Sequence, residues 1–357
     1  MKKILHIIDH LGLGGAQTVV KGFFEIQNLN NNILLYALRK VDINTKINNR
    51  NIILNDSNNK YNFPINQLRN IIIQNKIEVI HCHLAKSQII GYLLKKLFFP
   101  NIKLILQEHG QIFQEGKIYP FLMNSFRKKV DLFIAVSEAT KNKILEKTKY
   151  DSNKIEILYN FVDLNKFKKI EIENNKYGFT NNDLIVGFAS RLYEGKGYKE
   201  FIESADILLK KGYKLKFILA GDGPDKNYII DFINKNDLSK SIKLIGYVND
   251  MIIFYNSINC FVFPSHRESL GLTGIEANAC ACPVVASNIE GLNEIMINEK
   301  NALLFIKKDS KDLSEKIEKI FNNTKLRDNL IKNGLEEVKK YSLEKYIIKL
   351  SDIYEKL

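Results

Sequence analysis

The sequence predicts an α/β protein built from two Rossmann-like domains, and three observations point to this fold. The chain has 357 residues, which is more than one ordinary hydrophobic core accommodates. Residues 261–285 read as a strand, a loop, a helix and a second strand, which is the repeating unit of a parallel sheet. Residues 3–27 read as a buried strand, a glycine-rich turn and a helix, as at the start of a dinucleotide-binding fold.

The first half of the chain alternates between apolar runs of the strand type and amphipathic stretches. We expect strands at residues 3–8, 32–38, 51–54, 79–83, 103–107, 131–137 and 155–158. We expect helices at residues 16–27, 65–75 and 88–99, and another after Ser137, which is a plausible N-cap residue. Residues 116–130 mix aromatic and basic side chains, which suits a helix on an anionic membrane surface and equally an ordinary half-buried helix.

The second half repeats the alternation after a charged linker at residues 166–182. We expect strands at residues 184–189, 216–220, 242–245, 260–263 and 283–286, and a helix at residues 272–281. The chain is helical in pattern from Asp309 onward. Its last segment, residues 343–357, carries an apolar stripe made of Tyr346, Ile347, Leu350, Ile353 and Tyr354. The domain boundaries that we predict are residues 1–165, together with the helix at 343–357, and residues 166–342.

Composition narrows the class of protein. Hydrophobic residues make up 45% and charged residues 26%, which is typical of a soluble globular chain. No apolar run approaches the ~20 residues of a membrane helix, and the short apolar stretch after Met1 does not indicate a signal peptide. The four cysteines match neither a disulfide framework nor a zinc spacing. We therefore expect a cytoplasmic protein.

The net charge of +13 is unevenly distributed. Residues 1–163 hold 23 Lys and Arg against 13 Asp and Glu, a net charge of +10, whereas residues 164–357 hold 30 against 27, or +3. This excess predicts an anionic partner: a membrane surface, a phosphorylated substrate or nucleic acid. A composition biased toward Lys and Asn is the alternative, although it would raise lysine in both halves. No nucleic-acid-binding motif accompanies the charge, so nucleic acid is the least favoured partner.

The stretch at residues 261–285 holds two carboxylates, Glu268 and Glu276, with Gly271 and Gly274 between them. Glycines at a helix start leave backbone N–H groups open, and these groups together with the helix dipole attract phosphate. A carboxylate one turn into such a helix would repel an anion, but it suits a ligand with hydroxyl groups. A ribose attached to a diphosphate meets both requirements.

The run E-S-L-G-L-T-G-I-E-A-N-A-C-A-C-P-V-V resembles the E-x7-E signature of the retaining glycosyltransferases of family 4. The resemblance implies the GT-B fold, in which two Rossmann-like domains face each other across a cleft and a C-terminal helix crosses back onto the first domain. It also implies that Glu268 contacts the donor sugar and that Glu276 binds the ribose of the nucleotide. The backbone at Leu272 and Thr273 would approach the diphosphate.

Two further motifs of the second half resemble this family. The segment R-L-x-x-x-K-G carries Arg191 and Lys196, a planar fork and a point charge that together suit a diphosphate. Two exposed cations without a function are the alternative interpretation. The G-D-G-P turn begins at Gly221 and resembles a donor-binding element. Asp222 could be mistaken for a metal ligand, but the sequence has no D-x-D pair, so we expect no metal and no cofactor.

The first half carries three motifs that the resemblance places in the cleft. Gly14 and Gly15 belong to a G-G-A-Q loop, although the full G-x-G-x-x-G spacing is lacking. His109, in E-H-G at a strand end, would lie by the donor sugar, with a hydrogen-bonded structural histidine as the alternative. His81 and His83 alternate along one strand and are candidates for the acceptor side, but a structural role for one of them is equally open. They could ligate a metal, although no third ligand lies nearby.

The resemblance implies a metal-independent hexosyl- or N-acetylhexosaminyltransferase. Its donor would be a nucleotide diphosphate sugar, with UDP favoured over GDP. Its acceptor would be a glycan or a lipid-linked glycan of surface polysaccharide, lipopolysaccharide or glycoprotein synthesis, reached from the inner face of the plasma membrane. The alternatives are a UDP-sugar 2-epimerase and a non-catalytic partner subunit. Such a subunit would be expected to have lost Arg191, Lys196 or Glu276, which are all present.

Overall fold

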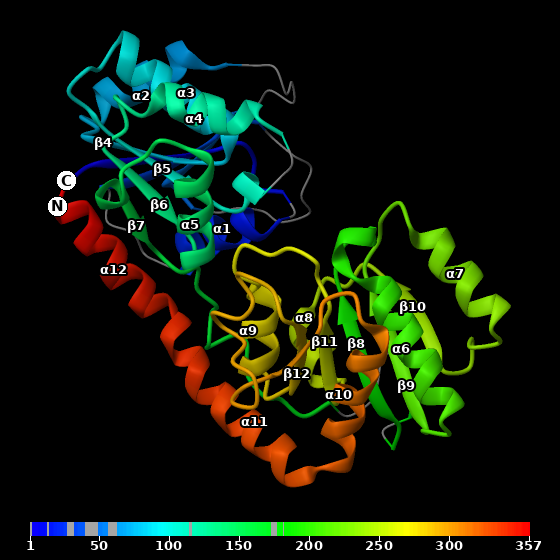
Figure 1. Cartoon of the computed structure of the whole chain (residues 1–357). Coiled ribbons are helices and arrows are strands. Elements are labelled where there is room, and N and C mark those ends of the chain that lie inside the picture. Colours follow the sequence, from blue (N-terminus) through cyan, green and yellow to red (C-terminus); the bar gives the residue numbers. More distant parts are fainter. Residues whose placement is uncertain are drawn as a thin grey trace. The chain divides into compact units, whose positions relative to one another are not determined.

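The computed structural model describes residues 2–12, 14–26, 32–39, 49–55, 63–113, 116–172, 177–180 and 182–357. The chain divides into two compact units (Figure 1). Unit 1 comprises residues 1–161 and 343–357, and unit 2 comprises residues 162–342. The division falls a few residues before the boundary that we predicted from the linker.

Unit 1 is organised around a seven-stranded parallel sheet with the strand order β3-β2-β1-β4-β5-β6-β7. Its strands are β1 (Ile4–Ile8), β2 (Ile33–Ala37), β3 (Ile52–Leu54), β4 (Val79–His83), β5 (Lys103–Glu108), β6 (Leu132–Ala135) and β7 (Ile155–Ile157). Its helices are α1 (Gly15–Ile26), α2 (Ile65–Gln74), α3 (Ala85–Leu97), α4 (Ile118–Phe126), α5 (Glu138–Lys147) and α12 (Leu343–Glu355), with short 3-10 turns η1 (Gln111–Phe113) and η2 (Ser152–Lys154). The strand order reverses between β1 and β4, the point where open α/β sheets bind ligands.

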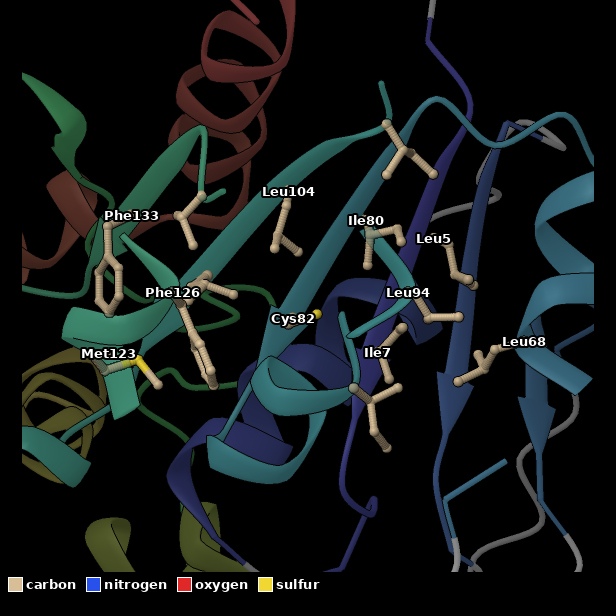
Figure 2. Packing of buried hydrophobic residues seen from close by; sticks show 14 of the residues in the cluster. Leu5, Ile7, Leu68, Ile80, Cys82, Leu94, Leu104, Met123, Phe126 and Phe133 are labelled. Carbon is tan, nitrogen blue, oxygen red and sulfur yellow. The ribbon is translucent and has the colours of Figure 1, made fainter. Parts of the chain in front are cut away.

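The core of unit 1 lies around its sheet. Helices cover both faces of a parallel sheet, so its strands are buried on both sides and are rich in apolar residues. All five residues of β1 and of β4 are buried. Figure 2 shows part of this core, where Ile7 and Ile80 of the sheet belong to one cluster with Leu94 of α3. The predicted N-cap is confirmed, because the Ser137 side chain accepts a hydrogen bond from the backbone N–H of Thr140 at 3.0 Å. The helix expected at residues 116–130 is shorter and spans only α4.

The C-terminal helix α12 is part of unit 1, as the resemblance implied (Figure 1). Tyr346, Leu350, Ile353 and Tyr354 are buried, which confirms the predicted stripe, whereas Ile347 is half-buried. The ring of Tyr346 packs 5.0 Å, between centroids, from that of Phe161. The ring of Phe161 therefore helps to anchor the helix.

Unit 2 holds a six-stranded parallel sheet with the strand order β10-β9-β8-β11-β12-β13. Its strands are β8 (Leu184–Ala189), β9 (Leu215–Ala220), β10 (Ile242–Gly246), β11 (Cys260–Phe263), β12 (Val284–Ser287) and β13 (Leu303–Phe305). Its helices are α6 (Tyr198–Lys210), α7 (Lys226–Lys235), α8 (Met251–Asn256), α9 (Leu272–Ala279), α10 (Ser310–Asn322) and α11 (Thr324–Glu337), with 3-10 turns η3 (Glu194–Lys196) and η4 (Val338–Tyr341). Strand β13 was not among the strands that we expected.

Candidate active site

The loop after β8 carries both cations of the R-L-x-x-x-K-G motif. Strand β8 ends at Ala189, the chain turns through η3, and α6 begins at Tyr198. Arg191 is exposed, whereas Lys196 is half-buried. Because ligands of open α/β sheets bind beyond the carboxyl ends of the strands, this loop places both cations at the edge where a ligand is expected.

Lys196 forms an ion pair with Glu268, which lies in the loop that follows β11. The Lys196 Nζ lies 2.5 Å from the Glu268 Oε1, and the two side chains are only 20% and 15% exposed. Burial by itself lowers the pKa of Lys196, but the charge of Glu268 and its hydrogen bond outweigh burial, so the pKa is raised. Lys196 is therefore fully charged at neutral pH, as a ligand of a diphosphate should be.

The G-D-G-P turn after β9 packs tightly against the cation loop. Gly221 has a φ of +136°, and a Cβ at this position would lie 1.8 Å from the carbonyl oxygen of Ser190. The backbone N–H of Leu192 donates to the carbonyl oxygen of Asp222 at 3.0 Å. Only glycine fits this approach without moving the backbone, so the turn fixes the position of the residues on either side of Arg191.

Helix α9 presents its N-terminus in the same group of loops. Gly271 precedes it with a φ of +95°, and a Cβ there would lie 2.3 Å from the Leu292 Cδ2. The first N–H groups of a helix have no partner within the helix and carry the positive end of its dipole. The backbone N–H groups of Leu272 and Thr273 are thus suited to an anionic ligand.

Glu276, on α9, is the second carboxylate of the E-x7-E motif. Its Oε2 accepts a hydrogen bond from the Tyr255 hydroxyl at 2.9 Å. Burial raises the pKa of Glu276 from 4.5 to about 7, and the hydrogen bond from Tyr255 opposes this rise. A carboxylate of this kind accepts hydrogen bonds from hydroxyl groups such as those of a ribose.

The turn after β1 places Gly14 and Gly15 at the start of α1 in unit 1. The Gly14 carbonyl oxygen accepts from the backbone N–H of Thr18 at 2.9 Å and from its hydroxyl at 3.0 Å. Among the described residues, apart from its chain neighbours and the backbone of its own helix, no heavy atom lies within 4 Å of where a Cβ on Gly15 would stand. A ligand can therefore approach the backbone closely at this turn.

His81 and His83 lie inside unit 1, where they are 0% and 1% exposed. Strand pairing sets His6 of β1 opposite His81, and the two ring centroids lie 4.6 Å apart. The expectation that no third histidine lies near the pair is therefore wrong, because the third one comes from a neighbouring strand. Both members of the H-x-H pair are buried, so neither side chain can contact a bound ligand directly. They can act on a ligand only through the residues that they contact.

The three histidines form a hydrogen-bonded group. One ring nitrogen from each of His6, His81 and His83 lies within 4.8 Å of those of the other two, which is a spacing that could hold a metal ion. However, His6 Nδ1 lies 2.9 Å from His83 Nε2, and the Tyr354 hydroxyl lies 2.9 Å from His6 Nε2 and 2.8 Å from His81 Nδ1. A metal would have to replace these hydrogen bonds, since a ligating nitrogen must offer its lone pair to the ion.

His109 follows β5 directly and is held by its neighbours in the sequence. The Glu108 Oε1 accepts from the backbone N–H groups of Gly110 at 2.7 Å and of Ile112 at 3.0 Å, which fixes the turn around His109. The His109 Nε2 lies 3.1 Å from the His83 Nδ1. Burial lowers the pKa of His109 to about 3, so the imidazole is neutral at neutral pH.

Sequence reasoning did not single out three polar residues of unit 1, namely Asp9, His6 and Tyr354, as candidates for the site. Asp9 directly follows β1, its Oδ1 accepts from the Ser87 N–H at 3.0 Å, and burial raises its pKa. Its position at a strand end was the available signal, and the same signal identified His109. His6 and Tyr354 gave no local signal, because each meets its partners only through the tertiary fold.

Two family models match the chain, one in each half. Residues 36–166 match the model described as Glycosyltransferase Family 4, and residues 169–337 match the model described as Glycosyl transferases group 1. An uncharacterized glycosyltransferase of Methanocaldococcus jannaschii is 33% identical over 81% of this chain and 78% of its own length. The chain belongs to glycosyltransferase family 4. Members of this family are retaining glycosyltransferases, as the E-x7-E signature indicated.

Two other relatives are named for steps of glycan synthesis. The capsular polysaccharide biosynthesis glycosyltransferase CapM of Staphylococcus aureus is 35% identical over 57% of this chain and 56% of its own length. The N,N'-diacetylbacillosaminyl-diphospho-undecaprenol alpha-1,3-N-acetylgalactosaminyltransferase of Campylobacter jejuni is 33% identical over 50% of this chain and 48% of its own. The matched part thus spans about half the length of these two relatives.

A solved structure shows the same fold as this family 4 chain. The crystal structure of Anabaena Alr3699/HepE in complex with UDP and glucose matches with a TM-score of 0.83 over 100% of both chains, at 18% sequence identity. Together with the two parallel sheets, this match confirms the predicted GT-B fold. In the part of the chain that the structure describes, no helix is both long and apolar enough to cross a membrane.

Proposed function

We propose that the protein transfers a sugar from a UDP-sugar to a hydroxyl group of a lipid-linked glycan and retains the anomeric configuration. The observation that carries this proposal is the Lys196–Glu268 ion pair beside the turn at Gly221. It combines a charged group for a diphosphate with a carboxylate for sugar hydroxyls at the carboxyl ends of β8, β9 and β11.

The chemical task at this site is to stabilise the diphosphate as it leaves the sugar. Arg191 would bind the phosphate oxygens with its planar fork, and Lys196 would add a point charge. The backbone N–H groups of Leu272 and Thr273 would contribute the positive end of a helix dipole. These groups supply the electrostatic stabilisation that a metal ion provides in other transferases. The incoming hydroxyl would enter on the side of the departing phosphate, which then takes its proton.

The remaining residues would bind the other parts of the donor. Glu276 would accept hydrogen bonds from the ribose, and the Glu268 Oε2 would accept one from the sugar, since its Oε1 is held by Lys196. In unit 1, His109 would orient the sugar, and Gly14 with Gly15 would let the ligand approach the backbone. His81 and His83 would act on the acceptor side only through His109, because both are buried.

A lipid-linked acceptor is supported by the surface of α4 in unit 1. Ile118 and Phe121 lie one turn apart on this helix and are 79% and 71% exposed. Lys117 precedes them and Lys128 follows, and both are exposed as well. Lys117 and Phe121 also line a pocket of about 320 Å³. Apolar groups flanked by cations suit an anionic membrane surface, so we expect the protein to work at the inner face of the plasma membrane.

The relative from Campylobacter jejuni supports the same choice of acceptor, since its name places its acceptor sugar on a diphospho-undecaprenol lipid. The excess of basic residues in the first half of the chain agrees with this choice, because both a polyprenyl diphosphate and an anionic leaflet carry negative charge.

Thermal unfolding without added metal tests the proposal. The purified protein would be unfolded with UDP, GDP, ADP and a panel of UDP- and GDP-sugars. A ligand present at a hundred times its dissociation constant should stabilise the folded state by about 2.7 kcal/mol. We expect the shift with UDP and one UDP-sugar, and its loss in Arg191→Ala. Arg327→Ala, the same change on α11 of unit 2, should retain it. A shift with GDP alone would mean that the donor is a GDP-sugar rather than a UDP-sugar. No shift with any of these ligands would favour a non-catalytic partner subunit.

A further inference from the structure

The two segments of unit 2 that carry the Lys196–Glu268 ion pair are joined a second time by a buried side-chain pair. His266 comes two residues before Glu268, and its Nε2 lies 2.9 Å from the Oε1 of Glu200 in the first turn of α6. These two side chains are only 11% and 10% exposed. The backbone N–H of His266 also donates to the carbonyl oxygen of Gly195 at 3.0 Å. His266 therefore contacts the segment of Lys196 through both its side chain and its backbone.

The hydrogen bond of this pair runs from His266 to Glu200. Burial by itself raises the pKa of Glu200, but the hydrogen bonds from His266 and from its own backbone N–H outweigh burial, so the pKa is lowered. The position of Glu200 in the first turn of α6 also favours the ionised form, because the helix dipole is positive there. An ionised carboxylate can only accept, so the Nε2 of His266 carries a proton and donates it to the bond.

The backbones of the two segments touch beside this pair. Gly197 has a φ of +74°, and a Cβ on it would lie 2.0 Å from the carbonyl oxygen of Pro264. On its other side the loop is held to β12, because the Ser287 hydroxyl donates to the carbonyl oxygen of Ser265 at 2.5 Å. The contact at Gly197 limits how closely the loop and the start of α6 can approach, and the side-chain bond of His266 opposes their separation.

A bound UDP-sugar would depend on this separation. In the proposed function Lys196 binds the diphosphate and Glu268 binds the sugar, so one ligand spans both segments. The negative diphosphate would compete with Glu268 for the ammonium group and would weaken the ion pair. His266 and Glu200 bind no part of the donor in that arrangement, so their hydrogen bond would persist while the ion pair weakens.

We propose that His266 is a positioning residue, whose hydrogen bond to Glu200 fixes the distance between Lys196 and Glu268 while a UDP-sugar is bound. It acts on the sugar through Glu268 and does not contact the donor itself. The contact between His266 and Glu200 stands on unit 2 alone, whereas its effect on the UDP-sugar rests on the proposed function.

Calorimetric titration of the full chain, with UDP and with the UDP-sugar that stabilises the wild type most, measures this effect. His266→Leu removes the donor and keeps a side chain of similar bulk. The ratio of the dissociation constant of the UDP-sugar to that of UDP should rise about tenfold, the contribution of one hydrogen bond. UDP has no sugar to reach Glu268, so its own dissociation constant should change little. His266→Gln keeps an N–H group that can reach Glu200 and should keep most of the wild-type ratio.

A second variant breaks the same bond from the other side. Glu200→Ala removes the buried carboxylate itself, so no buried charge is left without its donor. It should raise the ratio as His266→Leu does, and the double variant should raise it no further, because the two residues act as one pair. An unchanged ratio in both single variants, or an equal loss of UDP and UDP-sugar binding, would overturn the proposal.

Glu203→Ala is the matched control for Glu200→Ala. Glu203 lies three residues further along α6, where its Oε2 accepts from the Ser310 hydroxyl of α10 at 2.5 Å. The change removes a carboxylate from the same helix without touching the loop of Glu268. The control should keep the wild-type ratio, and a rise equal to that of Glu200→Ala would overturn the proposal.

Hydrogen exchange in the ligand-free chain distinguishes this inference from the proposed function. His266→Leu should speed the exchange of backbone N–H groups at residues 264–268, where the N–H of His266 is bonded to Gly195, and His266→Gln should not. A wild type that binds neither UDP nor any UDP-sugar would contradict the proposed function, but faster exchange would still show that His266 holds the loop. Unchanged exchange in His266→Leu would overturn the inference, whatever the protein binds.

Discussion

Lys196 and Glu268 contact each other, 2.5 Å from Nζ to Oε1, although 72 residues separate them in the sequence. The motifs had assigned them to different parts of the donor, the cation to the diphosphate and the carboxylate to the sugar. In the structure the two residues form one ion pair. The Glu268 carboxylate raises the pKa of the Lys196 ammonium, and the ammonium donates a hydrogen bond to one of the two carboxylate oxygens. Replacing either residue should therefore disturb both functions.

The first prediction concerns this pair. Lys196→Ala should lower turnover at least ~100-fold, because it removes a charge that stabilises the departing diphosphate and leaves Glu268 without its partner. The measurement is release of the nucleotide from the UDP-sugar in the presence of an acceptor. Folding of the variant is checked by its unfolding temperature.

Lys199→Ala is the matched control for this prediction. Lys199 lies three residues further on and pairs with Glu194 at 3.5 Å, where the two side chains are 37% and 68% exposed. Exposed pairs contribute little to stability, so this variant should keep most of its turnover. Equal losses in Lys196→Ala and Lys199→Ala would show that removing any cation near the start of α6 has the same effect.

The second prediction is a dependence of stability on pH that comes from Glu276. Burial raises its pKa from 4.5 to about 7, so between these values the native state binds more protons than the unfolded state. The stability that this group contributes is therefore present at low pH and lost as the pH rises through that window. The change corresponds to about 3 kcal/mol at most.

Glu276→Gln should remove this dependence. We expect the variant to gain stability relative to the wild type at pH 8 and to gain little at pH 4.5, as measured by urea unfolding at each pH. Glu290→Gln, at an exposed position of unit 2, serves as the control and should follow the wild type at both values. The same gain at both values in Glu276→Gln would contradict a raised pKa.

The parts of the site that the sequence predicted are those that local sequence determines. Arg191 with Lys196, and Glu268 with Glu276, each lie in a single loop or loop-helix segment, so their spacing along the chain reveals them. The strands were equally visible, because buried parallel strands are continuous apolar runs.

The histidine group could not be predicted, because its members come together only through contacts between distant parts of the sequence. His6 meets His81 through the register of two strands 75 residues apart, and His81 meets Tyr354 across 273 residues. Neither the register of parallel strands nor the docking of a terminal helix leaves a pattern in the residues themselves. The prediction that the C-terminal helix has a buried stripe was confirmed, but the stripe did not indicate that one of its tyrosines binds histidines.

The third prediction separates a steric clash from backbone strain in the G-D-G-P turn. Gly221→Ala would bring a Cβ to 1.8 Å from the Ser190 carbonyl oxygen, in addition to the strain of a positive φ. Gly212→Ala has the strain alone, with a φ of +90° and no described heavy atom within 4 Å of the new Cβ. We expect Gly212→Ala to cost about 1–2 kcal/mol in urea unfolding.

Gly221→Ala should cost more than this and should also abolish stabilisation by UDP, because the backbone beside Arg191 must move. Gly212→Ala should keep the stabilisation by UDP. Similar costs in the two variants would mean that the turn is not packed against the cation loop as the structure shows.

The fourth prediction concerns the exposed surface of α4, which we propose binds an anionic membrane. The double variant Ile118→Ser and Phe121→Ser removes two apolar side chains that are 79% and 71% exposed, so the fold should lose little stability. Each of them would insert into the boundary of an anionic leaflet, and their loss should weaken binding to vesicles at least about tenfold. Flotation with vesicles of phosphatidylcholine and phosphatidylglycerol measures this.

The matched control, Ile73→Ser with Leu97→Ser, removes two apolar side chains of α2 and α3 that are 59% and 61% exposed and lie outside the α4 surface. It should float like the wild type. Because Lys117 and Lys128 flank the apolar pair, binding should also weaken as salt is raised, since the Debye length falls to about 3 Å at 1 M. Equal losses in the two double variants, or flotation that ignores phosphatidylglycerol, would show that α4 does not dock on an anionic leaflet, and the acceptor would then have to be reached in solution.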